Sequence, residues 1–133
     1  MKYLLLSLMA TLLTACAGHA PDNQRGSVDG EVFYLQRMAL PPTATLSVAL
    51  QDVSLADAPA RTLARQSGPV GGQVPLPFHL TYDQSKVQPG HTYAVSARIE
   101  ADGKLLMIST ERYTVDLTLE EKPPVKIRVN PAR

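Results

Sequence analysis

Very few side chains in this 133-residue sequence are of types that do chemistry. There is one cysteine, Cys16, and there are three histidines, His19, His79 and His91. A thiolate can act as a nucleophile or accept a modifying group, and a histidine can move protons or bind a metal ion. These four residues are therefore the first places to look for a site.

The three histidines are interpreted as surface residues. None has a cysteine or a carboxylate at the spacing of a metal-binding motif. His79 points outward between two apolar neighbours of an alternating pattern, and His91 follows a Pro-Gly turn. We therefore expect no metal site and no cofactor.

Other catalytic patterns are also missing from the sequence. There is no Gly-x-Ser-x-Gly motif, and Gly71-Gly72 lacks the lysine and the following helix of a phosphate-binding loop. Glu100 and Asp102 lie close enough in sequence to act as an acid–base pair, but we expect them at an exposed hairpin tip. We assign no catalytic residue and interpret the protein as not an enzyme.

Cys16 is explained by the residues before it. Lys2 precedes an apolar run over residues 3–13, which is shorter than the roughly 20 residues that a membrane-spanning helix requires. The motif Leu13-Thr14-Ala15-Cys16 resembles the lipobox of bacterial lipoproteins, in which the thiol takes a diacylglyceryl group before cleavage.

The motif predicts that residues 1–15 are a lipoprotein signal peptide, cut between Ala15 and Cys16. The alternative is a plain secretory signal that happens to contain a cysteine. Several acyl chains on Cys16 would hold the protein on a membrane, since each buried methylene contributes about 0.8 kcal/mol. Because Ala17 replaces the aspartate of the inner-membrane retention signal, we predict the periplasmic face of the outer membrane.

The composition fits one domain behind a tether. Residues 16–27 are predicted to be the lipidated Cys16 and a flexible tether, because the residues after Cys16 are small, polar and without periodicity. Residues 28–133 are long enough for one core. The formal net charge is only +1, including Lys2, which argues against a nucleic-acid partner. Without tryptophan, there is also no sign of an aromatic platform for sugars.

Apolar residues alternate with polar or small ones along most of the domain. Val28 to Tyr34, Ala44 to Leu50, Val74 to Tyr82, Tyr93 to Ile99 and Val125 to Val129 all follow this period of two. Pro and Gly residues separate the runs at intervals of about 10 to 20 residues. We predict an all-β, single-domain antiparallel β-sandwich of about seven or eight strands.

Three local features refine this prediction. Asp102-Gly103 predicts a tight hairpin. Pro75 and Pro77 predict an edge strand whose proline side has no neighbour, or a strand that starts late. There is no convincing amphipathic helix, and only residues 58–66 and 83–87 could hold a helical turn.

Arg98 is an outward-facing charge between two inward-facing residues. It is interpreted as a surface ladder charge or as the partner of Asp83 or Asp52.

Four segments of the domain carry a family resemblance. They are Ala39-Leu40-Pro41-Pro42 with the run to Ser54, Asp57-Ala58-Pro59-Ala60, Gly72 to Asp83, and Tyr93 to Leu106. In this order they resemble the YbaY/YscW family of small bacterial lipoproteins, whose type III secretion members act as pilotins.

The resemblance implies a lipidated β-sandwich without enzymatic activity or cofactor. A pilotin is an assembly chaperone that binds secretin subunits and carries them to the outer membrane. We therefore expect a protein client, with a secretin-type client as a candidate, and a membrane contact through the lipid anchor. The alternative is an envelope lipoprotein that binds a small molecule or a glycan. No binding residue is assigned from the sequence.

Overall fold

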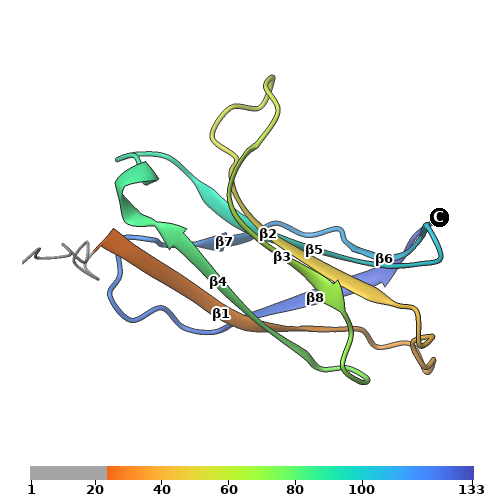
Figure 1. Ribbon diagram of the computed structural model, residues 1–133. Coiled ribbons are helices and arrows are strands. Elements are labelled where there is room, and N and C mark those ends of the chain that lie inside the picture. The colour runs from red at the N-terminus through yellow and green to blue at the C-terminus, as the bar shows by residue number, and fades with distance from the viewer. Residues whose placement is uncertain (1–23) are drawn as a thin grey trace, which may run out of the picture.

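The computed structural model describes residues 24–133 and is almost entirely β (Figure 1). The elements are β1 (Arg25–Phe33), β2 (Thr45–Asp52), β3 (Arg61–Pro69), β4 (Leu76–Asp83), the 3-10 turn η2 (Gln84–Lys86), β5 (Tyr93–Ala101), β6 (Lys104–Ser109), β7 (Tyr113–Val115) and β8 (Val125–Pro131). The predicted all-β fold and the number of strands are confirmed.

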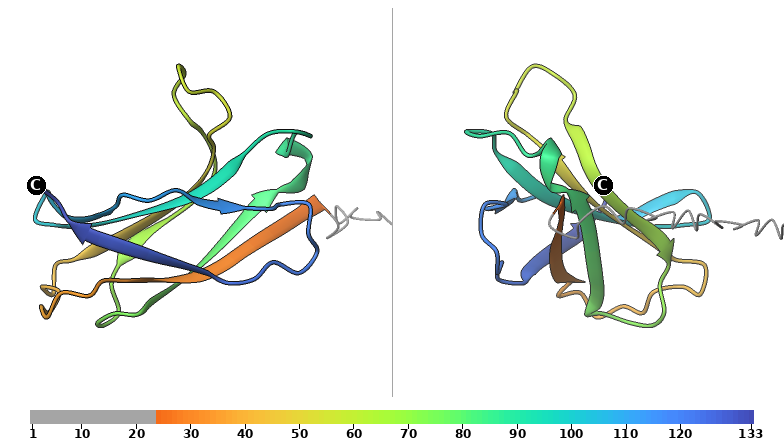
Figure 2. Two further views of the ribbon diagram at one scale, coloured as in Figure 1. Left: turned by 180° about the vertical axis from the view of Figure 1, so that it is seen from behind. Right: turned by 60° about the vertical axis from the view of Figure 1, so that its left-hand side comes forward.

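The eight strands form one sheet instead of two. Seven of them follow the order β3-β2-β5-β6-β8-β1-β4, and β7 pairs with β5 beside this path. β8 pairs with β6 through its second half and with β1 through its first half, so that it joins both parts of the sheet. The sheet bends around one core and is nearly closed into a barrel (Figure 2).

All pairs along this path are antiparallel except one. β1 and β8 run parallel from Gly30, opposite Val125, to Phe33, opposite Arg128. A parallel pair requires a long connection between its strands. Here the connection is the chain from the end of β1 at Phe33 to the start of β8 at Val125. The antiparallel pattern expected from the sequence therefore describes the other pairs but not this one.

The core is made by the inward-facing positions of the alternating strands. β4 shows the pattern most simply, since Leu76, Phe78, Leu80 and Tyr82 are buried and the residues between them are exposed. Val28, Val48, Ile99, Met107 and Ile127 meet them from the other strands and are fully buried. Within residues 24–133 no polar or charged residue is buried, so hydrophobic burial is the main stabilising contribution to this fold.

The proline-bearing segment behaves as the sequence predicts. β4 begins at Leu76, after Pro75, and lies at one end of the strand path. The backbone N–H of His79 donates to Oε1 of Gln66 on β3, at a distance of 2.9 Å. Pro77 lies two residues before His79 and faces the same side, where it has no N–H to donate. β4 therefore pairs with β1 but does not complete a ladder with β3.

One predicted helical turn is wrong. Residues 58–66 include the first part of β3, which pairs with β2 from Asp52, opposite Arg61, to Thr45, opposite Pro69. The sequence does not predict this strand, because its inward positions carry Ala64, Gln66 and Gly68 in place of large apolar residues. The other predicted turn, over residues 83–87, is confirmed as η2.

The predicted hairpin at Asp102-Gly103 is also confirmed. Asp102 has a φ of 53° and Gly103 a φ of 76°, and together they join β5 to β6. Both residues lie in the left-handed region that short hairpin turns require.

Gly30 lies where β1 contacts two strands at once. It is opposite Phe78 of β4 and opposite Val125 of β8. A Cβ atom at this position would lie 2.7 Å from the Phe78 ring and even closer to the backbone oxygen of Val125. The missing side chain thus lets the Phe78 ring cover the backbone of β1 while β8 pairs beside it.

We expect Gly30→Ala to lower the free energy of unfolding by about 2–3 kcal/mol, because the added methyl group meets backbone that cannot move aside. Urea denaturation measures this difference. Gly68→Ala is the matched control, since a Cβ there meets nothing within 4 Å. Equal stabilities of the two variants would contradict the close approach at Gly30.

Candidate binding clefts

The strongest sequence prediction lies outside the described residues. Ala15 and Cys16, the signal peptide over residues 1–15 and His19 all precede residue 24. From residue 24 onward, the structure contains no helix that is long and apolar enough to cross a membrane. The candidate sites that the structure itself shows are therefore in the β domain.

Each of the two histidines in the β domain is paired with an aspartate from a distant part of the chain. His79 contacts Asp29, which is its cross-strand neighbour on β1. His91 Nδ1 lies 2.6 Å from Oδ2 of Asp52, at the end of β2. No local pattern in the sequence indicates these pairs, because 50 and 39 positions separate the partners.

Asp52 is the centre of a small hydrogen-bond network. Its Oδ1 accepts hydrogen bonds from the Ser54 hydroxyl at 2.6 Å and from the Ser54 backbone N–H at 3.0 Å. The Ser54 hydroxyl oxygen in turn accepts from the Thr92 backbone N–H at 2.8 Å. The hydrogen bond from Ser54, and then that from His91, lower the pKa of Asp52 from 3.8 to about 2. The network ties the loop after β2 to the segment that leads into β5.

Two further aspartates repeat this motif. Asp83 accepts from the hydroxyl and the backbone N–H of Ser85, and Asp116 accepts from those of Thr118. These hydrogen bonds lower the pKa of both carboxyl groups. The motif thus fixes the chain where β2 and β4 end and shortly after β7.

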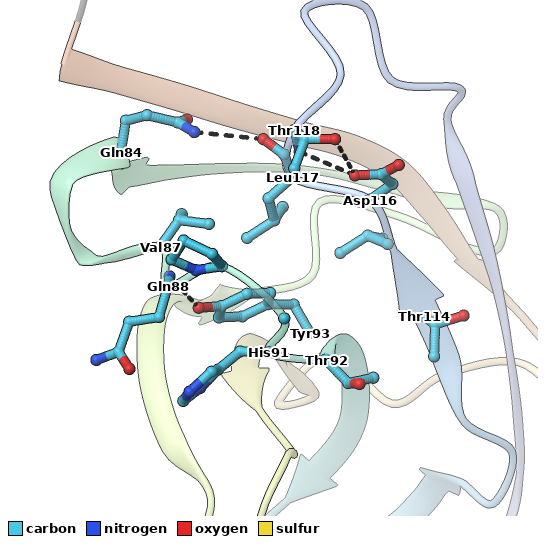
Figure 3. Close-up of a pocket in the computed structure, with 13 residues that line it drawn as sticks. Gln84, Val87, Gln88, His91, Thr92, Tyr93, Thr114, Asp116, Leu117 and Thr118 are labelled. Atoms are coloured by element: carbon cyan, nitrogen blue, oxygen red, sulfur yellow. Dashed lines mark hydrogen bonds between the residues drawn. The ribbon is translucent and has the colours of Figure 1, made fainter.

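The segment around Thr92 forms one wall of a cleft of about 730 Å³, which we call the end cleft. Figure 3 shows its lining residues, which come from the η2–β5 segment and from β7 with the residues after it. The Tyr93 hydroxyl accepts from the Gln88 backbone N–H at 2.8 Å, and Gln84 Nε2 donates to the Leu117 carbonyl at 3.3 Å. The lining combines apolar side chains with hydroxyl and amide groups, so the end cleft suits an amphipathic ligand or peptide.

A second cleft of about 360 Å³ lies between β3 and the start of β4, and we call it the seam cleft. Its apolar lining includes Leu46, Val70, Leu76 and Pro77. Gln66 also lines the cleft, where its side chain accepts the hydrogen bond from His79 of β4. The two clefts lie at opposite ends of β2, because Thr45 is beside Pro69 and Asp52 is beside Tyr93.

The remaining residues singled out in the sequence have structural positions. Arg98 pairs with Glu100 on its own strand, with an N–O distance of 2.5 Å, and not with Asp83 or Asp52. Asp102 accepts a hydrogen bond of 3.2 Å from the Thr43 hydroxyl. Glu100 and Asp102 therefore have separate partners and are not arranged as an acid–base pair.

The charged residues of the described chain form pairs and not larger clusters. Between residues 24 and 133 there is no group of three or more His, Cys, Asp and Glu residues that could hold a metal ion. The geometry defines a small β domain with a cleft at each end of β2.

Comparison with known proteins then gives the family. Residues 23–129 match the model of the YscW family, described as type III secretion system lipoprotein chaperones. This match covers most of the chain, and the protein therefore belongs to the YscW family. The resemblance found in the sequence is confirmed.

Two relatives support this assignment. The chain is 40% identical over 94 residues to the lipoprotein YbaY of Escherichia coli K12, a match that covers 70% of this chain and 50% of YbaY. The chain thus aligns with about half the length of that relative. It is also similar to the structure of an alternative pilotin from the type II secretion system of Vibrio cholerae, with 45% identity and a TM-score of 0.77. That match covers 83% of this chain and 99% of the pilotin chain.

Both clefts escaped the sequence analysis. The end cleft depends on β7, which has only three residues and shows no period. The seam cleft depends on β3, and the sequence does not predict this strand because its inward positions lack large apolar residues. The Asp-x-Ser or Asp-x-Thr motif at Asp52, Asp83 and Asp116 was the available signal for the ends of the strands.

The Asp52 network predicts a pH dependence of stability. Because folding lowers the pKa of Asp52, its contribution is present above pH 4 and is lost as the pH falls from about 4 towards 2. We expect the free energy of unfolding of Asp52→Asn to fall less than that of the unmodified protein over this range. Urea denaturation at several pH values measures this, with Asp57→Asn in the exposed β2–β3 loop as the control. Equal pH profiles for Asp52→Asn and the unmodified protein would refute the assigned role of Asp52.

Proposed function

We propose that this protein is a non-enzymatic lipoprotein of the outer membrane that acts as a pilotin for a secretin-type client. The observation that carries the proposal is the similarity to the Vibrio cholerae pilotin, which extends over almost all of that chain at 45% identity. Membership of a family of lipoprotein chaperones supports the same role.

The anchor in this proposal is Cys16 with its acyl chains, on the periplasmic face of the outer membrane. Residues 17–24 then link the lipid to β1 and extend at most about 28 Å. The start of β1 and the C-terminus lie at opposite ends of the described domain (Figures 1 and 2). The end of the domain where β1 starts therefore stays near the membrane, and a bound client is held close to the lipid surface.

The domain offers this client binding surfaces and no chemistry. The end cleft provides apolar side chains such as Val87 and Leu117 together with polar side chains such as Gln88 and Thr114. Such a surface fits a peptide segment that buries one face and leaves the other in water. No step of bond making or breaking is required of this protein in the proposed role.

The test is the assembly of the secretin in cells. We expect deletion of the gene to reduce the secretin multimers in the outer-membrane fraction, and the intact gene to restore them. Cys16→Ser should not restore them, because the unlipidated protein no longer reaches the outer membrane. His19→Ala is the matched control, since it changes the same segment and leaves the lipidated thiol intact.

Outer-membrane multimers at normal level in the deletion strain would overturn the pilotin role. The result would then favour the alternative, an envelope lipoprotein that binds a small molecule or a glycan in the end cleft. Full activity and outer-membrane fractionation of Cys16→Ser would overturn the lipid anchor.

A further inference from the structure

The end cleft lies at the end of the domain where the tether is attached. Arg25, the first residue of β1, is opposite Asp83 of β4. Asp83 is followed directly by Gln84, which lines the cleft. The domain is therefore joined to its proposed lipid anchor beside the end cleft, and a ligand in the cleft is held close to the lipid surface.

The floor of the end cleft continues the hydrophobic core. Tyr93 and Leu117 line the cleft and are only 4% and 3% exposed. Val87 and Val115 also line it, and both are half-buried side chains packed against the core. An apolar side chain placed on these two valines would remove them from water and extend the core.

The lining of the end cleft contains no lysine and no arginine, and its two titratable side chains besides Tyr93 are His91 and Asp116. His91 is already paired with Asp52, at an Nδ1–Oδ2 distance of 2.6 Å. Asp116 accepts both of its hydrogen bonds from Thr118 through Oδ1. Within residues 24–133 it forms no ion pair. Its second oxygen, Oδ2, is therefore available to a ligand.

A second aspartate lies on the opposite wall. Gln84 Nε2 donates to the Leu117 carbonyl at 3.3 Å and joins the two walls at one end of the cleft (Figure 3). Asp83 precedes Gln84 and Asp116 precedes Leu117, so a carboxylate flanks each side of this bridge. Asp83 also accepts through Oδ1 alone, from the hydroxyl and the N–H of Ser85. The bridged end of the cleft thus carries two carboxylates that turns hold in place.

The charges of both walls together are negative. Residues 83–93 and 113–122 contain four carboxylates and two lysines, a net charge of −2 with His91 neutral. These charged residues are Asp83, Lys86, Asp116, Glu120, Glu121 and Lys122. Lys122 donates to the Leu119 carbonyl at 2.8 Å and lies 5.6 Å from the centre of the Tyr82 ring. This field repels phosphate and carboxylate groups, including those of phospholipids and fatty acids, and attracts a cation.

We propose that the end cleft binds an amphipathic segment of the client that carries a lysine or an arginine. The apolar side chains of the segment cover Val87 and Val115. Its cationic group pairs with Asp116 and Asp83 at the bridged end. The inference deepens the proposed function and rests on it in one respect, since it takes the segment to belong to the client.

Two synthetic peptides test the charge preference with the full-length protein in detergent, and detergent without protein is the blank. One is the blocked heptapeptide Ser-Leu-Ser-Leu-Ser-Lys-Ser, and the other has glutamate in place of lysine. Alternate side chains of an extended peptide lie on one face, so both leucines and the charged residue can enter the cleft together. We expect the lysine peptide to bind about threefold to tenfold more tightly, as measured by fluorescence polarisation of labelled peptide.

Protein variants show whether this preference comes from the end cleft. We expect a variant with both Asp83→Asn and Asp116→Asn to bind the two peptides equally. Asparagine keeps an oxygen that accepts the hydrogen bonds of Ser85 and Thr118, so the turns are retained. The matched control combines Asp57→Asn and Asp102→Asn, which removes the same charge outside the cleft lining.

The apolar floor is tested separately from charge. Val87→Thr keeps the shape of the side chain and adds a hydroxyl, so we expect it to weaken binding of both peptides by the same factor. Val125→Thr is the matched control, because Val125 is also a half-buried valine packed against the core but does not line the end cleft. The circular dichroism spectrum checks that all variants are folded.

Failure of both peptides to bind would overturn the inference, as would equal binding of both to the unmodified protein. A lysine preference that survives the double asparagine variant would also overturn it, since the peptide would then bind elsewhere. Self-association of the protein that Val87→Thr abolishes would assign the cleft to a second copy of the chain and would contradict it too.

These outcomes are distinct from failure of the pilotin role. Binding of the lysine peptide in the end cleft, with normal secretin multimers in the deletion strain, would support the inference and reject only the secretin as the client. Loss of multimers in that strain, with no binding of either peptide, would support the pilotin role and overturn the inference.

Discussion

The missing backbone donor of Pro77 is the constraint on which this architecture depends. The strand path begins with β3 and ends with β4, and joining these two strands would close a barrel. Pro77 faces β3 without an N–H, and the His79 N–H donates to the Gln66 side chain and not to a backbone carbonyl of β3. The sheet therefore stays open along one seam. The seam cleft and the unpaired edge of β3 are both consequences of that opening.

An open sheet must hold its two parts together elsewhere, and β8 does this. It pairs with β6 on one side and with β1 on the other. The close approach at Gly30 lets β1 contact β8 while the Phe78 ring covers its backbone. The buried side chains from both parts then form one core, although the barrel is not closed. The core and the β8 pairings thus stabilise the domain, and the opening between β3 and β4 does not interrupt either of them.

The sequence predicted the parts of this structure that large apolar residues specify. Alternation over residues 74–82 and 93–99 located β4 and β5, because their inward side chains are buried in the core. β3 was missed for the opposite reason, since its inward positions carry Ala64, Gln66 and Gly68 in place of large apolar residues. The pairs of Asp29 with His79 and of Asp52 with His91 depend on strand register and loop positions, which no local pattern contains. The candidate surfaces of this protein therefore arise where the core pattern is weakest.

Amide hydrogen exchange along β3 of the full-length protein tests most directly whether this edge is free. The account predicts an alternation, with slow exchange at Gln66 and Gly68, whose N–H groups face β2, and fast exchange at Arg65 and Ser67, which face the open side. Exchange at Arg65 and Ser67 as slow as at Gln66 would contradict it, because their N–H groups would then be paired and the seam would be closed.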